Sequence, residues 1–110
     1  MPLFVTIGYG NQAGYDRTAP KVREKAHAHD TQLQNVGVTM GIAMAPTQVR
    51  NHDGAGIETK DGPYMSSALP VAGFALIEAA SLEEAVEMVS QSPCAVAHGV
   101  IEVWPLKQSP

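Results

Sequence analysis

Residues 71–85, VAGFALIEAASLEEA, contain the two signals that decide the fold. Residues 71–79 are apolar at almost every position, which is typical of a strand covered on both faces. Ser81 follows with Glu84 three residues later, the spacing in which each side chain caps a free backbone amide of the other. The stretch therefore predicts a buried strand that passes directly into a helix.

The remaining segments extend this alternation of strands and helices. Pro20 suits the first turn of a helix and Gly37 suits its end, so we expect a helix between them. Its apolar stripe has the spacing of one helix face and consists of Val22, Ala26, His29, Leu33 and Val36. Three further runs rich in β-branched residues end at glycine or proline, and we expect strands there: residues 3–9, 38–44 and 99–106. Pro93 is expected to end the second helix near Ser92.

A hairpin is expected between the second and third strands of this series. Residues 47–51 and 55–60 read as its two sides, with Asp53-Gly54 at the tip. Asp61-Gly62-Pro63 then ends the returning side, because glycine allows positive φ and proline removes a backbone donor. Asp61 is thus presented at a turn, either as a turn former or as a functional carboxylate.

The order β, α, β, inserted hairpin, β, α, β is that of a ferredoxin-like α+β fold with both helices on one face of the sheet. The other face has no helix to cover it. We therefore expect a second copy packed sheet to sheet, giving a homodimer that forms a dimeric α+β barrel. A chain of 110 residues fits one domain, spanning residues 1–110.

Composition excludes several classes of partner. The net charge is −4 and no Lys/Arg cluster is present, which argues against nucleic acid and against an anionic membrane surface. The first residues lack a basic segment and a long apolar run, so neither a signal peptide nor a membrane span is expected. Cys94 is the single cysteine, which excludes an intrachain disulfide and fits a cytoplasmic protein. No ligand pair has chelating spacing on one helix, so we expect no metal and no cofactor.

Four stretches carry a family resemblance: DGPY at 61–64, GFALIEAASLEEA at 73–85, Pro93, and GVIEVWPL at 99–106. Together they resemble the YCII-related family, in particular its DGPF-domain branch, and the resemblance extends over essentially the whole chain. It implies a dimeric α+β barrel with a cleft between the first helix and the sheet, where a histidine and an aspartate have been proposed as an acid/base pair. A few relatives act on chlorinated or hydroxylated aromatic breakdown products, and many DGPF members are associated with alternative sigma factors.

The chain departs from this family pattern at several positions. Residues 65–67, MSS, replace the usual Thr-Lys-Glu run, and Trp104 stands where arginine usually precedes the last proline. The usual histidine of the first helix falls at Ala26 in this chain. His27 and His29 are the two neighbouring replacements.

His29 is the first candidate for a catalytic base, because it interrupts an apolar stripe and histidine exchanges protons near neutral pH. Asp61 would orient its imidazole if the turn folds back over the first helix. His27 lies roughly 200° around the helix from His29, so one faces inward and the other outward. Tyr64 and Trp104 are expected to stack on a planar ligand or to lie in a dimer interface.

Two functions of different classes follow from these residues. The first is a cofactor-free enzyme that abstracts a proton from a small ring-shaped organic molecule, with elimination or isomerisation, using His29 as base and Asp61 as its partner. The second is a non-catalytic dimeric module that senses a ligand or docks a protein, linked to sigma-factor regulation. A pocket with His29 and Asp61 within hydrogen-bond distance would favour the enzyme, and a filled cleft would favour the module.

Overall fold

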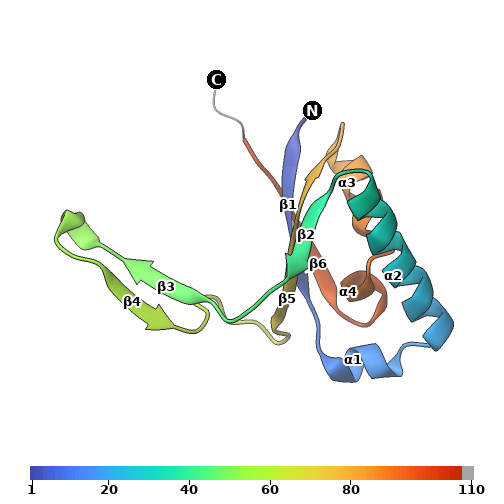
Figure 1. Ribbon diagram of the computed structural model, residues 1–110, viewed down its shortest axis with the longest axis horizontal. Helices are drawn as coiled ribbons and strands as arrows, with labels where there is room; N and C mark the ends of the chain where they lie inside the picture. The colour runs from blue at the N-terminus through green and yellow to red at the C-terminus, as the bar shows by residue number, and fades with distance from the viewer. Residues whose placement is uncertain (108–110) are drawn as a thin grey trace.

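The computed structural model describes residues 1–107 and contains a four-stranded antiparallel sheet with helices on one side (Figure 1). The strand order is β2–β5–β1–β6. These strands are β1 Leu3–Tyr9, β2 Thr39–Ile42, β5 Val71–Glu78 and β6 Val100–Pro105. Helical connections join β1 to β2 and β5 to β6, so the ferredoxin-like α+β fold expected from the sequence is confirmed.

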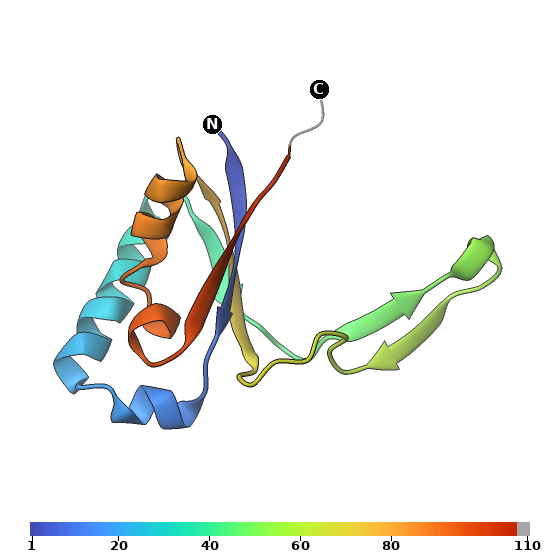
Figure 2. The same cartoon turned by 180° about the vertical axis from the view of Figure 1, so that it is seen from behind.

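Four helices lie on the same side of this sheet (Figures 1 and 2). They are α1 Gln12–Arg17, α2 Pro20–Asn35, α3 Leu82–Val89 and α4 Pro93–Val96. The Ser81 cap of α3 is confirmed, since the Glu84 amide donates to Ser81 Oγ at 3.1 Å. The reciprocal bond differs: the Glu84 carboxylate accepts from the Ala80 amide at 3.1 Å instead of from the Ser81 amide. No helix within the described residues is long and apolar enough to cross a bilayer.

Two short helices differ from the sequence-based expectation. The sequence predicts no helix between the first strand and Pro20, but Asn11 accepts a hydrogen bond from the Gly14 amide at 2.9 Å and so caps α1. Pro93 does not end the helix before it, which already stops at Val89. It starts α4 instead, because proline needs no hydrogen-bond acceptor in a first helical turn.

The hydrophobic core lies between the helices and one face of the sheet. It is built from Phe4, Ile77, Ala79, Ala85 and Val89, all buried. Ile77 lies opposite Phe4 in the β1–β5 ladder, so both side chains point to the helical side. The expected sequence of strand, cap and helix thus delivers most of this core from residues 77–89.

The opposite face of the sheet, here called the open face, is uncovered in the single chain. Alternation along β1, β5 and β6 directs a row of apolar side chains to it, among them Val5, Ile7, Phe74, Leu76, Val100 and Trp104. Four of these side chains are 42–52% exposed. Residues 71–79 were expected to be covered on both faces. Within one chain, only their helical face is covered.

The inserted hairpin, here called the arm (residues 47–61), forms a sheet of its own. It consists of β3 Thr47–Arg50, the turn His52–Gly54 and β4 Glu58–Asp61. The Gly62 amide donates to the Pro46 carbonyl at 3.0 Å and closes its base. The arm projects from the side of the main sheet that faces away from the helices (Figures 1 and 2).

Candidate functional site

A cleft of about 620 Å³ lies between α2 and the helical face of the sheet. Helix α2 contributes His27, Asp30 and Gln34 to its wall. Tyr15 of α1 and Cys94 of α4 narrow one end. The strands contribute mostly small residues, including Gly8, Gly73 and Ala75, and their lack of bulk keeps the cleft open.

Two of these glycines cannot carry a side chain without a clash. A Cβ at Gly8 would lie 2.9 Å from Cys94 Sγ, and a Cβ at Gly73 would lie 2.7 Å from the Gly41 carbonyl oxygen. These distances are well inside van der Waals contact. Gly8 and Gly73 therefore allow the close packing of the cleft walls.

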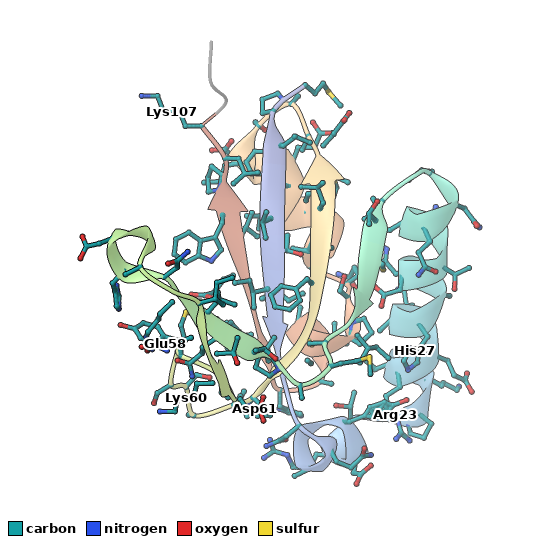
Figure 3. The ribbon with its side chains drawn as sticks, turned by 60° about the vertical axis from the view of Figure 1, so that its left-hand side comes forward. Arg23, His27, Glu58, Lys60, Asp61 and Lys107 are labelled. Atoms are coloured by element: carbon teal, nitrogen blue, oxygen red, sulfur yellow. The ribbon has the colours of Figure 1, made fainter. Side chains whose placement is uncertain are left out.

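Three side chains from α1 and α2 form a cluster at the mouth of the cleft. Tyr15 Oη and His27 Nε2 are 2.9 Å apart, a hydrogen bond that fixes the imidazole. The Arg23 guanidinium lies 4.8 Å from the centre of the Tyr15 ring, in cation–π contact. Arg23 and His27 are one helical turn apart on α2 and project together toward α1 (Figure 3). The cluster orients His27 at an exposed position that a ligand can reach.

Asp30 lies deeper in the cleft, one turn after His27 on the same wall. Burial raises the pKa of Asp30 above its ordinary value, while the charges of His29 and His27 and a hydrogen bond with Ser92 act in the opposite direction. A carboxyl group with a raised pKa holds a proton more readily than an ordinary aspartate. This perturbation, in a cleft and beside a histidine, is typical of a functional acid.

Cys94 is half-buried against the same cleft. Burial and the negative charge of Asp30 raise the pKa of the Cys94 thiol. The reactive form of cysteine is the thiolate, and a raised pKa disfavours it. Cys94 therefore contributes a neutral wall to the cleft and is poorly suited to act as a nucleophile.

A comparison with protein families matches residues 2–109 to the YCII-related domain. The chain belongs to the YCII-related family. The match confirms the resemblance drawn from the sequence, which extends over essentially the whole chain. A search of curated proteins finds no match.

The first candidate base of this YCII-related chain, His29, does not line the cleft. It is half-buried beside α3, and its Nε2 donates to the Met88 carbonyl at 2.6 Å. His29 thus ties α2 to α3. The stripe to which it was assigned is buried at Ala26 and Leu33 but exposed at its two ends, Val22 and Val36, because α2 packs on the neighbouring helices only along its middle.

Asp61 is exposed at the base of the arm and does not line the cleft. Within residues 1–107, no hydrogen bond joins it to His29, so the single chain does not form the expected pair. The physical reason is that the arm leaves the sheet on the side away from α2, which keeps Asp61 apart from His27 (Figure 3). The turn after β4 did form as expected, with Gly62 at φ +101°.

The two aromatic candidates also lie outside the cleft. Tyr64 is 83% exposed beyond the arm, with its ring 5.9 Å from the Arg50 guanidinium. Trp104 lies on the open face, directly opposite Val5. It therefore does not form a wall of the cleft, and its role in a dimer interface stays a prediction.

Sequence reasoning missed Tyr15 and Asp30. Asn11 is a favourable N-cap residue, and it was the signal in the sequence for α1. Because Tyr15 belongs to α1, this helix also determines where Tyr15 lies. Asp30 lies outside the predicted apolar stripe of α2, and its spacing of three from His27 puts both on one wall of the cleft. Within the described residues, no group of three or more His, Cys, Asp or Glu side chains is arranged to hold a metal ion.

The raised pKa of Asp30 predicts a pH-dependent cost to folding. The folded chain holds this proton more tightly than the unfolded chain, so the fold loses stability as the pH rises above the unfolded pKa of Asp30, and the penalty vanishes below that pKa. Asp30→Asn removes the penalty. We expect it to raise the urea midpoint relative to wild type at pH 7 and to leave it unchanged near pH 3.

Asp53→Asn is the matched control, because Asp53 is exposed at the tip of the arm. It should not change the midpoint at either pH. A wild-type protein that is at least as stable as Asp30→Asn at pH 7 would contradict the assignment of Asp30 as a strained carboxyl group.

Proposed function

We propose that this chain is a cofactor-free acid/base enzyme that acts on a small ring-shaped organic molecule held in the cleft. The observation that supports this is the position of His27 and Asp30, one turn apart on α2 and both lining the same cleft. The proposal keeps His27 from the sequence candidates and replaces the pair His29–Asp61 by His27–Asp30. The reaction class is proton abstraction followed by isomerisation or elimination.

His27 is the proposed base. In the tautomer whose Nε2–H donates to Tyr15 Oη, the other ring nitrogen, Nδ1, has the free lone pair that accepts a proton from the substrate. Tyr15 holds the ring in one orientation, which a general base requires. Asp30, in its protonated form, would donate to the substrate oxygen on which negative charge develops.

The cleft floor suits a flat, mainly apolar ligand. Gly73 and Ala75 leave a shallow surface there. An apolar cleft with few polar groups binds a small molecule by burial and orients it by those groups. A ring with an enolisable carbonyl meets both requirements.

We also assign the chain to the DGPF-domain branch of the family, on the motif Asp61-Gly62-Pro63-Tyr64. In this chain the motif ends the arm: Gly62 takes positive φ and its amide binds the Pro46 carbonyl. The motif therefore has a structural role at this position, and the acid/base groups of the proposal come from α2.

The test is hydrogen exchange at carbon. Wild-type protein is incubated in D₂O with a panel of enolisable cyclic ketones and lactones, and deuterium incorporation next to the carbonyl is followed by NMR. We expect His27→Gln to lower the catalysed exchange rate by about a hundredfold or more, since removal of a general base commonly has an effect of this size. Asp30→Asn should lower it as well.

His52→Gln is the matched control, because His52 is exposed on the arm and absent from the cleft wall. It should leave the exchange rate unchanged. Equal rates in wild type and His27→Gln would rule out His27 as the base. Shifts of cleft resonances by these compounds, without any exchange, would identify a binding site without catalysis.

The second candidate function is a dimeric module that senses a ligand or docks a protein, linked to sigma-factor regulation. The observation that favours it is the open face, whose apolar side chains include Phe74, Leu76 and Trp104. A sheet face of this composition is well suited to a second copy of the same sheet. Homodimerisation is compatible with both candidate functions, and we propose it for either.

A further inference from the structure

The arm is an isolated two-stranded sheet. β3 and β4 pair with each other and with no strand of the main sheet within residues 1–107. A lone two-stranded hairpin is at best marginally stable in water. The arm therefore needs a surface to pack on, and the described part of its own chain does not provide one.

The register of the arm separates its residues into two faces. Direct cross-strand pairs place Thr47, Val49, Thr59 and Asp61 on one face and Gln48, Arg50, Glu58 and Lys60 on the other. The first face has no charge except Asp61 at its base. The second face carries both signs of charge. We call them the Val49 face and the charged face.

Two residues of the charged face, Gln48 and Arg50, make contacts within the chain. Arg50 donates to Gln48 at 2.8 Å and lies over the Tyr64 ring. The Gln48 amide donates to the Gly62 carbonyl at 3.0 Å. The Val49 face, by contrast, is open to solvent: Val49 is 66% exposed and Thr59 is exposed as well. The Val49 face is therefore the one left to pack on another surface.

The direction and length of the arm indicate what that surface is. The arm extends on the same side of the molecule as the open face and stands in front of it (Figure 3). Stacked sheets lie about 10 Å apart, whereas a strand advances about 3.3 Å per residue, so the arm reaches roughly 20 Å from its base. A second copy on the open face would therefore lie within reach of the arm along most of its length.

We propose that the Val49 face of the arm packs on a second copy of this chain and clamps the homodimer. The inference rests on the homodimer proposed above and adds its second contact region. In a two-fold dimer each copy would supply one arm and receive the arm of the other copy. The same contact would then form twice, and the assembly would stop at a dimer. The arm would then gain the apolar support that an isolated hairpin lacks.

The test compares two substitutions that each raise the net charge by one. Val49→Lys places the charge on the Val49 face, and Glu58→Gln changes the charged face. Both side chains are exposed in the single chain, so neither substitution removes core packing. We expect Val49→Lys to raise the dimer dissociation constant at least about tenfold, because it buries a charge at the contact. Glu58→Gln should change it less than about twofold.

Sedimentation velocity over a dilution series measures the dimer dissociation constants of the wild type and of both variants. Thr59→Lys gives an independent second variant on the Val49 face. A wild-type dimer whose dissociation constant is unchanged by Val49→Lys and by Thr59→Lys overturns the clamp and leaves the homodimer intact. A wild-type protein of single-chain mass overturns the homodimer and the clamp together.

Discussion

Replacing Gly99 with alanine is expected to lower the free energy of unfolding by about 3 kcal/mol, a large fraction of the roughly 5–15 kcal/mol of a typical domain. Gly99 lies in the short connection between α4 and β6, directly before Val100, the first residue of β6. A Cβ at this position would collide with the Tyr9 carbonyl oxygen and lie 2.6 Å from the Cys94 carbonyl oxygen. Both obstacles are backbone, so β6 would have to separate from β1 or from α4.

Gly56→Ala is the matched control for this substitution, because nothing lies within 4 Å of a Cβ at Gly56. Its effect should stay within about 0.5 kcal/mol. Urea unfolding followed by circular dichroism measures both variants, and the melting temperature of Gly99→Ala should fall by roughly 10 °C. Equal stability of the two variants would show that the contact between α4 and β1 is looser than described.

Leu76→Asp is expected to dissociate the proposed homodimer almost completely, with an increase of the dissociation constant of about a hundredfold or more. Leu76 lies on β5 opposite Val5, in the middle of the open face. In the single chain it is 42% exposed, so a carboxylate there stays hydrated. Between two packed sheets the same carboxylate would lose its water and gain no partner.

Val22→Asp is the matched control, because Val22 on α2 is also 42% exposed but lies on the helical side. Light scattering at micromolar concentration should give about twice the 11.6 kDa chain mass for wild type and for Val22→Asp, and the chain mass for Leu76→Asp. A Leu76→Asp protein that keeps the doubled mass would show that the open face is not the dimer interface.

A polar contact on the open face would influence this assembly. Tyr9 donates to Glu102 at 2.5 Å, and this hydrogen bond raises the pKa of the Tyr9 hydroxyl. Both groups would enter a sheet-to-sheet interface already paired. Because a buried polar group is costly only when it lacks a partner, this pair is compatible with an otherwise apolar interface.

The two proposed roles involve opposite sides of one sheet: acid/base chemistry in the cleft on the helical side, and homodimerisation on the open face. Along β5, Ala75 points to the cleft and Leu76 points to the open face. Substitutions at neighbouring positions therefore test chemistry and assembly separately.

The sequence by itself determined the strands, the two longer helices α2 and α3, and their order. The cap Ser81–Glu84 depends on residues three apart, and the strand within residues 71–79 is indicated by a continuous apolar run. Pro20 as the start of α2 and Asp53-Gly54 at the tip of the arm are equally local signals. These interactions form within a few residues of chain, so they are readable without knowledge of the packing. The family follows from the same local stretches.

Only the tertiary structure decided which residues of α2 meet the cleft. Ala26 and Leu33 form the buried line of this helix, and at about 100° per residue Asp30 and His27 lie on one flank of that line while His29 lies on the other. Which flank faces the cleft depends on how α2 packs against α3 and α4, a choice that no residue of α2 specifies alone. The position of Asp61 was settled in the same way. Its turn is local, but the direction of the arm depends on β3 and β4 pairing with each other instead of joining the main sheet.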